Sequence, residues 1–244
     1  MKRYAVLIGN TNGLPGINKD LEDFEKFLNS DIGGAWDSSE IYKDYNVRKN
    51  NLVDIFFNLK KYSLDYFIFY FSGHGALDRT SNFTKLVLNK NNECIDESQV
   101  NCIAPRQLNI FDCCRAIPET SENLITCSAQ FSTEELRINS RKIYDARIMQ
   151  AEKQQINLYA CSKGEYANAT GKGSVYTQQL ISAANRLSST SLVTVLACHN
   201  SAYQLTVDGA KNQRPDFYTT KQNLPENKQL ILAISKKLDR QLYG

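Results

Sequence analysis

The segment Leu64–Phe71 restricts the fold more than any other, because it is apolar on both faces of an extended chain. A strand of this kind belongs in the middle of a parallel sheet, where helices cover both faces. Five more strands are predicted at Arg3–Gly9, Ile41–Val47, Arg106–Phe111, Asn157–Ala160 and Gln229–Ile234. Helices are predicted between them at Asn18–Asn29, Lys49–Lys61 and Ser174–Leu187. This alternation predicts an α/β fold, with a doubly wound, mainly parallel sheet of six strands flanked by helices.

Three segments lie outside this regular alternation. A small hairpin away from the main sheet is predicted from Lys85–Leu88 and Glu93–Ile95, which flank a turn of four polar residues. The stretch Ser191–Val207 is rich in β-branched residues, which favour a strand, but its apolar side chains recur at helical spacing. We interpret it as a helix. Between Pro215 and Pro225 we expect a loop.

Nothing in the sequence divides the chain into separate units. Apolar residues make up 42% of the 244 residues, enough to bury a sizeable core, and no repeat or linker interrupts them. One domain spanning residues 1–244 is therefore expected. The 29 Lys and Arg and 26 Asp and Glu residues leave a net charge of +3 that is spread along the chain. A nucleic acid is not expected as a partner, because no basic block is present.

The sequence also bears on where the protein works. The longest apolar run, Tyr66–Phe71, is too short to cross a bilayer, so no membrane partner is expected. The apolar stretch Tyr4–Ile8 is cut off by polar residues and glycines, unlike a signal peptide. Seven cysteines, two of them adjacent, fit reduced thiols better than a set of disulfides. Together these features predict a cytoplasmic protein.

Chemically unusual residues follow two of the predicted central strands. Leu64–Phe71 leads into Ser72-Gly73-His74-Gly75, and Arg106–Phe111 leads into Asp112-Cys113-Cys114-Arg115. Neighbouring parallel strands that end in His and Cys would hold an imidazole and a thiol over one edge, as a nucleophilic pair requires. The chain has two histidines, and we interpret His199 as structural because it lies on the apolar stripe of a predicted helix.

These two segments resemble the histidine and cysteine motifs of the caspase and metacaspase group of cysteine peptidases. The resemblance is carried by Phe69-Tyr70-Phe71-Ser72-Gly73-His74-Gly75 and Ile110-Phe111-Asp112-Cys113-Cys114-Arg115-Ala116. Further matches are Ala5-Val6-Leu7-Ile8-Gly9-Asn10 with Gly16 and Asp20, and Gly173-Ser174-Val175-Tyr176-Thr177. Ala160-Cys161-Ser162 with Glu165-Tyr166-Ala167 resembles the strand that forms the far wall of the substrate cleft, called the cleft wall below. These matches run in the right order over about residues 3–185 and look most like the short stand-alone bacterial members. The implied fold is a single caspase-like domain without a prodomain.

The resemblance implies a role for each residue of the two motifs. Cys114 would be the nucleophile, since the reactive thiol in these families directly precedes the Arg or His of the motif, and Cys113 would be a bystander. His74 would be the base and then the acid, and the backbone N–H groups of Gly75 and Cys114 would bind the oxyanion. Ala116 departs from the pattern, because Gly is usual there.

The resemblance also implies a preference for the residue on the amino side of the cut bond, called P1. Asp112 and Asp20 match acidic positions of the metacaspase pocket, and Ser72 matches its neutral polar wall. Two carboxylates attract a guanidinium and repel an acid, so a basic P1 is expected, with Arg preferred and Lys accepted. The alternative is that Asp20 only caps a helix and Asp112 only fixes the cysteine loop.

The segment Ile117–Gln155 corresponds in position to the linker whose cleavage matures caspases. Its basic residues, each a candidate cleavage site, are Arg137, Arg141, Lys142, Arg147 and Lys153. Against cleavage, Ser132 and Glu135 form a capping box that predicts an amphipathic helix reaching about Gln154.

The expected activity is that of a cysteine endopeptidase acting on a protein, such as a gasdermin-like effector in bacterial defence. The alternative of another class is an inactive caspase-fold scaffold, and a flavodoxin-like signalling domain is a further rival. The turn Gly9–Gly13 lacks the Lys-Ser/Thr ending of a phosphate loop, and the cysteines lack zinc-site spacing. No cofactor or metal is expected, and calcium activation stays open because no EF-hand-like loop is visible. A monomer is favoured over an obligate dimer.

Overall fold

The computed structural model describes residues 1–117, 137–189, 193–210 and 212–235. A six-stranded sheet lies at its centre, in the order β12-β8-β7-β3-β1-β2. Its strands are β1 (Arg3–Gly9), β2 (Ile41–Tyr45), β3 (Tyr66–Gly73), β7 (Arg106–Cys113), β8 (Gln154–Tyr159) and β12 (Asp216–Thr219). All neighbours pair in parallel except β12, which pairs antiparallel with β8. The predicted α/β fold, with β3 in the interior of a mainly parallel sheet, is confirmed.

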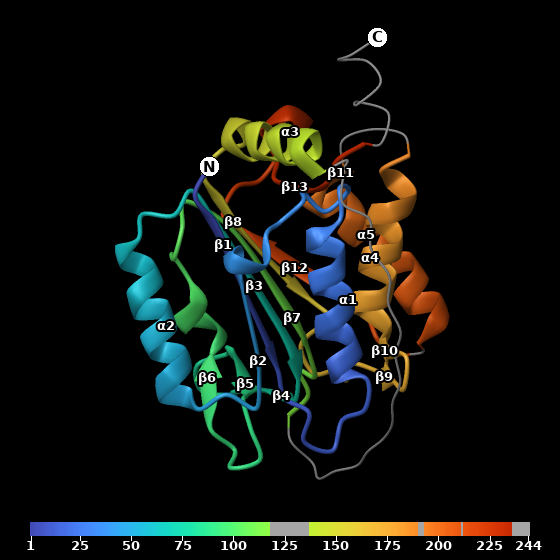
Figure 1. The fold of residues 1–244 in the computed structure, drawn as a ribbon. Helices are drawn as coiled ribbons and strands as arrows, with labels where there is room; N and C mark the ends of the chain where they lie inside the picture. The colour runs from blue at the N-terminus through green and yellow to red at the C-terminus, as the bar shows by residue number, and fades with distance from the viewer. Residues whose placement is uncertain (118–136, 190–192, 211, 236–244) are drawn as a thin grey trace.

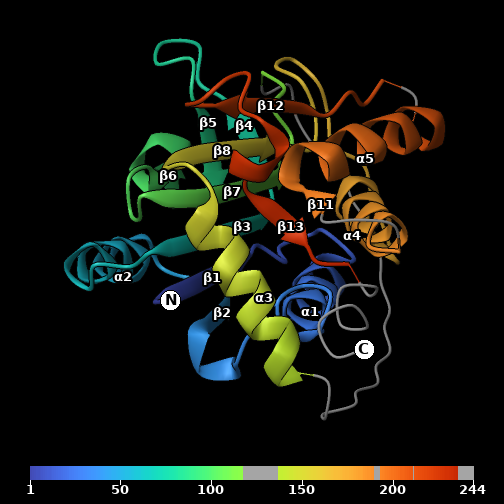
Figure 2. The same cartoon turned by 90° about the horizontal axis from the view of Figure 1, so that it is seen from above.

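Helices cover both faces of this sheet (Figures 1 and 2). Their bounds are α1 (Ile17–Asn29), α2 (Lys49–Lys61), α3 (Arg137–Gln150), α4 (Val175–Leu187) and α5 (Val195–Gly209). Helices α1, α4 and α5 pack on one face, whereas α2 lies on the other. Helix α3 lies at the end of the sheet where the chain begins (Figure 1).

The smaller elements surround the main sheet. One three-stranded sheet consists of β4 (Gly75–Leu77), β5 (Thr84–Val87) and β6 (Cys94–Asp96). Two sheets of two strands each are formed by β9 (Ala169–Thr170) with β10 (Gly173–Ser174), and by β11 (Val193–Thr194) with β13 (Ile231–Ala233). Short 3-10 helices are η1 (Ser38–Glu40), η2 (Glu97–Val100) and η3 (Glu226–Lys228). Elements β4, β9 and β10 gather at the lower end of the sheet in Figure 1, where β1, β3 and β7 end.

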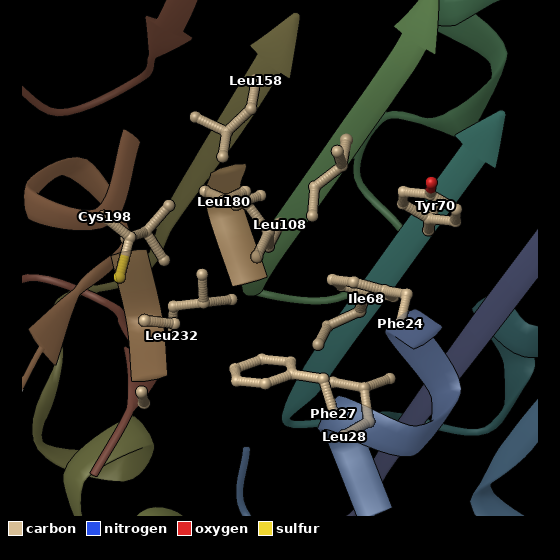
Figure 3. Close-up of a cluster of buried hydrophobic side chains, with 14 of the residues drawn as sticks. Phe24, Phe27, Leu28, Ile68, Tyr70, Leu108, Leu158, Leu180, Cys198 and Leu232 are labelled. Atoms are coloured by element: carbon tan, nitrogen blue, oxygen red, sulfur yellow. The ribbon is translucent and has the colours of Figure 1, made fainter. Parts of the chain in front are cut away.

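The alternation of side chains along β3 divides the core into two clusters. Ile68 and Tyr70 point toward α1, where they meet Phe24 and Phe27 (Figure 3), and Phe67 and Phe69 belong to the cluster under α2. All six aromatic or aliphatic side chains are buried. Burial of such a side chain stabilises the fold by about 1.5–3 kcal/mol, so this strand anchors the sheet from both sides.

The sixth strand of the main sheet was predicted in the wrong place. The predicted last strand, Gln229–Ile234, is shorter in the structure and pairs with β11 outside the main sheet. The sixth strand is instead β12, inside the segment between Pro215 and Pro225 that was expected to be a loop. This edge strand has four residues and no buried side chain, so it lacks the apolar pattern that identifies a strand in a sequence. It is held instead by backbone pairing with β8.

Two other predictions are corrected at their boundaries. Helix α3 ends at Gln150 and β8 begins at Gln154, so the helix predicted to reach Gln154 is too long and the strand predicted from Asn157 is too short. The capping box at Ser132 and Glu135 lies outside the described residues. Both signals in Ser191–Val207 are real, since its β-branched start forms β11 and the helical spacing becomes α5. The hairpin predicted at residues 85–95 is confirmed as β5 and β6.

Candidate active site

Strands β3 and β7 bring the predicted histidine and cysteine motifs together at one edge of the sheet. Ser72 pairs with Asp112, and Gly73 pairs with Cys113 in the last step of the parallel register. His74 and Cys114 are the residues that directly follow these two neighbouring strands. The structure thus places these two residues at corresponding positions, just past the carboxyl ends of the two central strands.

The two adjacent cysteines have different surroundings. Cys113 is 1% exposed and packs in the core cluster under α2, where burial raises the pKa of its thiol well above the usual range. Cys114 is only partly buried, and its Sγ lies 3.7 Å from the carbonyl oxygen of Ala167. A substrate can reach Cys114 but not Cys113 without moving the core. Burial also raises the pKa of Cys114, so the resting group is the thiol.

His74 is oriented by a backbone carbonyl that no sequence motif identifies. Its Nε2 lies 2.7 Å from the oxygen of Asn12, in the turn after β1. A carbonyl oxygen only accepts hydrogen bonds, so Nε2 carries the hydrogen and the lone pair of the neutral ring is on Nδ1. The turn Gly9–Gly13, which contains Asn12, therefore fixes the tautomer of His74.

Gly75 lies directly against the cysteine loop. A Cβ added to this residue would come within 2.5 Å of the Cys113 sulfur and 2.7 Å of the Cys114 carbonyl oxygen. Contacts this short exclude any side chain, because neither the backbone nor the buried thiol can move away easily. The requirement for glycine explains the His-Gly pair of the motif and keeps the two predicted oxyanion-binding residues, Gly75 and Cys114, close together.

The three predicted specificity residues form one buried acidic recess. We use this name for Asp20, Ser72 and Asp112, which are 0%, 0% and 3% exposed. The Ser72 hydroxyl donates to Asp20 at 2.9 Å, and the backbone N–H of Ser174 donates to the other oxygen of Asp20 at 2.7 Å. Asp112 accepts from the Thr177 hydroxyl at 2.6 Å and from its backbone N–H at 3.2 Å. The first turn of α4 thus holds Asp112, as expected for a carboxylate at a helix N-terminus.

Asp20 and Asp112 are buried close together, so a state in which both carboxylates are charged is strongly unfavourable. Burial, and next the nearby charge of Asp112, raise the pKa of Asp20 well above its usual range. Burial also raises the pKa of Asp112. Among the described residues, no Lys, Arg or His side chain pairs with either carboxylate. Such a site favours an added cation, since buried charges are stable only when compensated.

Gly173 lets α1 and the β9–β10 hairpin approach each other around this recess. Its φ of +106° is unfavourable for other residues, and a Cβ there would lie 2.4 Å from Asp20 Oδ1. Beneath Thr177, the hydroxyl of Tyr70 lies 2.8 Å from the Thr177 hydroxyl. The supports of Asp20 and Asp112 at Ser174 and Thr177 were missed from the sequence. Their signal was the segment Gly173–Thr177, to which no function was assigned.

Arg115 fixes the loop that carries Cys114. Its side chain is buried, stacks 3.8 Å from the centre of the Tyr159 ring and pairs with Asp216 on β12 at 3.2 Å. Its backbone N–H donates to the carbonyl of Glu165 at 3.0 Å. The cysteine loop is thereby tied both to the edge of the sheet and to the predicted cleft wall. A cavity of about 430 Å³ lies beside this wall, lined by Gly164, Glu165, Tyr166, Val207, Asn212, Gln213 and Arg214.

The second histidine has a structural environment. His199 is 2% exposed, its Nδ1 lies 2.8 Å from the Tyr176 hydroxyl, and burial lowers its pKa to about 4. The neutral ring is thus the stable form, packed edge-on against Tyr176 and Phe217.

Two of the basic residues considered as cleavage sites are held within α3. Arg141 donates to Asp37 at 2.8 Å and to Glu40 at 2.9 Å. Arg147 is 9% exposed and donates to the Asn227 carbonyl at 2.9 Å. A peptidase binds its substrate extended, so cleavage at either residue would require the helix to unfold.

Within the part of the chain that the structure describes, no helix is long and apolar enough to span a membrane. In the same residues, no three His, Cys, Asp or Glu side chains are grouped as a metal site would require.

The fold and this site can be compared with those of known proteins. A caspase-1 structure from Spodoptera frugiperda has a TM-score of 0.62 at 11% identity, covering 96% of this chain and 91% of that chain. A crystal structure of a Geobacter sulfurreducens protein has a TM-score of 0.61 at 15% identity, covering 94% and 97% of the two chains. At these identities the similarity shows the fold alone, and it is the caspase fold.

The family follows from the sequence itself. Residues 2–235 match the family model described as the caspase domain of peptidase family C14, and the chain therefore belongs to this family. No curated protein sequence matches it significantly. The resemblance inferred from the histidine and cysteine motifs is confirmed at the level of the family.

Proposed function

We propose that this chain is a cysteine endopeptidase that cuts proteins after a basic residue, with Cys114 as nucleophile and His74 as acid and base. The observation that carries the proposal is the position of the acidic recess. Asp112 and Ser72 lie two residues before Cys114 and His74 on β7 and β3. Asp20 on α1 adds the second buried carboxylate, and no Lys, Arg or His among the described residues pairs with either one. A substrate whose P1 side chain neutralises the recess would have its next peptide bond close to Cys114.

The reaction uses groups of this chain alone. As substrate binds, the Cys114 thiol gives its proton to Nδ1 of His74 and the sulfur attacks the P1 carbonyl carbon. The N–H groups of Gly75 and Cys114 stabilise the oxyanion that forms. His74 then protonates the leaving amine, which breaks the peptide bond and leaves a thioester on Cys114. Water, deprotonated by His74, attacks this thioester and releases the carboxylate product and the thiol.

The charge of the recess accounts for specificity. A guanidinium can contact two carboxylates at once, whereas an acidic P1 side chain would add a third negative charge to a buried site. Lys carries the same charge at a single point, so it is accepted less well. Because Asp20 and Asp112 are buried, we propose that the P1 side chain opens the recess as it enters.

We propose further that the uncut chain is active. Arg141 and Arg147 are held in α3, and residues 118–136 contain no Lys or Arg at all. An enzyme that requires a basic P1 has no site in that stretch.

The natural substrate would be a protein with an accessible basic residue. A gasdermin-like pore-forming effector is a specific candidate, suggested by the resemblance to short bacterial members of the group. Incubation with such a protein should give a single cut after Arg or Lys with the wild-type chain and none with Cys114→Ala.

A peptide library tests the proposed function most generally. The wild-type chain, verified as intact by mass spectrometry before and after the reaction, should cut after Arg, more slowly after Lys, and not after Asp. Cys114→Ala is the control for contaminating peptidases. Absence of cleavage in all peptides would favour the inactive scaffold, and cleavage after a non-basic residue would refute the role of the acidic recess.

A further inference from the structure

The side chain of Asn10 belongs to a closed ring of hydrogen bonds that includes His74. Its Oδ1 accepts from the Asn12 N–H at 3.0 Å, and its Nδ2 donates to the Val87 carbonyl at 2.8 Å. Val87 in turn donates its N–H to the His74 carbonyl at 3.0 Å, and the His74 ring contacts the Asn12 carbonyl at 2.7 Å. Four bonds therefore link Asn10, Asn12, His74 and Val87 into one ring.

The ring connects the backbone of His74 to the carbonyl that its own imidazole contacts. Val87 belongs to β5 and holds the main chain at His74, whereas Asn12 meets the far side of the imidazole. The Asn10 side chain is hydrogen-bonded to both Val87 and Asn12. It therefore sets the position of the Asn12 carbonyl relative to the His74 ring that donates to this carbonyl.

Only an asparagine fits this position. The residue must donate to one carbonyl and accept from one N–H within a short reach, which an amide does and a carboxylate does not. Asn10 is 0% exposed, and its backbone N–H donates to the Ser72 carbonyl at 3.0 Å, so it is held in place between β1 and β3. Gly73 also approaches it closely, since a Cβ on Gly73 would lie 2.8 Å from Asn10 Cβ.

We propose that Asn10 is a positioning residue for catalysis, which holds the Asn12 carbonyl in place and thereby keeps His74 in the tautomer with its lone pair on Nδ1. This inference rests on the proposed function. The hydrogen bonds of the Asn10 side chain go to Asn12 and Val87 and not to the acidic recess or Cys114, so its contribution acts on the chemical step. Loss of the Asn10 side chain should therefore lower kcat and leave KM for an Arg substrate nearly unchanged.

The chain contains a matched control in Asn89. This residue is 5% exposed, its Oδ1 accepts from the Asn91 N–H at 3.0 Å and its Nδ2 donates to the Val47 carbonyl at 2.9 Å. It makes the same two kinds of hydrogen bond in a different turn. Asn89→Ala should cost a similar amount of stability without affecting His74.

The experiment measures kinetics and the histidine tautomer in the same variants. Asn10→Ala should lower kcat about 10- to 100-fold, in line with the cost of a small misplacement of a catalytic group, with KM within about twofold. Asn89→Ala should keep the wild-type kcat. Asn10→Ser, whose hydroxyl can still accept from the Asn12 N–H, should recover part of the loss and serves if Asn10→Ala does not fold.

Histidine ring ¹⁵N spectra provide a readout that needs no substrate, and only two histidines contribute to them. Wild-type His74, identified by its loss in His74→Ala, should show the Nε2–H tautomer, and Asn10→Ala should show a mixture of tautomers. A folded Asn10→Ala with the wild-type kcat and tautomer would refute the proposal, as would an equal loss of kcat in Asn89→Ala. If the wild-type chain cuts no peptide, the proposed function fails, whereas the spectra still decide the role of Asn10.

Discussion

The predicted reacting groups follow two members of the acidic recess, Ser72 and Asp112, on strands β3 and β7, yet their surroundings differ. His74 and Cys114 are partly open to solvent, whereas Ser72 and Asp112, each two residues earlier, are buried against α1 and α4. The reacting groups must be reached by a peptide backbone. The recognising charges act more strongly when water is excluded. At the carboxyl end of a parallel strand, a step of two residues is thus enough to separate a group that recognises the substrate from a group that reacts with it.

The largest expected effect concerns the open half of this comparison. Cys114→Ala should reduce kcat/KM for an Arg substrate at least about 1,000-fold, because the other described cysteines near the ends of β7 and β8, Cys113 and Cys161, are buried. Cys113→Ala should keep activity within a few-fold and lose stability instead, since it removes a buried core side chain. Steady-state kinetics and thermal melts of both variants make the comparison. Equal loss of activity in two folded variants would mean that the wrong sulfur is assigned.

The second effect concerns the buried half. Asp112→Asn keeps the shape of the side chain and an acceptor for Thr177 but removes the charge. Loss of one partner of a desolvated charge pair costs about 2–5 kcal/mol, roughly 30- to 5,000-fold in kcat/KM for an Arg substrate. Asp54→Asn, an exposed position on α2, is the matched control. Unchanged cleavage after Arg by the Asp112 variant would separate the recess from specificity.

The smallest effect is a gain of stability from the same recess. The raised pKa of Asp20 means that ionising this group destabilises the folded chain, starting above its unfolded pKa of about 3.9 and growing until pH exceeds the folded value. Asp20→Asn can still accept from the Ser174 N–H and removes this loss. It should melt a few degrees above wild type at pH 8, since about 1 kcal/mol corresponds to about 2–4 °C in a domain of this size.

The difference between the two melting temperatures should shrink as pH falls through about 4 and vanish below about 3, where both states of the wild-type chain hold the proton. Thermal melts across this range measure it. A variant that is less stable than wild type at pH 8 would show that the Asp20 carboxylate is compensated in the free protein.

The parts of the fold that were predicted correctly are those that local pattern determines. Strand β3 carries apolar side chains on both faces, so its place inside the sheet follows from its own residues. Strand β12 exposes Phe217 and Tyr218 and is held by backbone pairing with β8, which no local pattern reveals. The boundary between α3 and β8 was missed for a related reason, because the polar residues at the junction suit either structure.

The candidate site divides in the same way. His74 and Cys114 are identified by side chains in distinctive motifs, and the register of β3 with β7 follows from the parallel sheet. The Asn12 carbonyl and the N–H groups of Ser174 and Thr177 are backbone atoms, so no residue type points to them. The supporting role of Asn10 emerges only when β1, β3 and β5 are seen together.

Covalent labelling tests the central claim most directly. A peptidyl acyloxymethyl ketone with Arg at P1 is incubated with the wild-type chain, with the same probe bearing Asp at P1 as control, and the modified residue is located by peptide mass spectrometry. The Arg probe should label Cys114 alone, the Asp probe should label nothing, and Asp112→Asn should slow labelling by the Arg probe. Labelling of Cys113, or equal labelling by the two probes, would contradict the account.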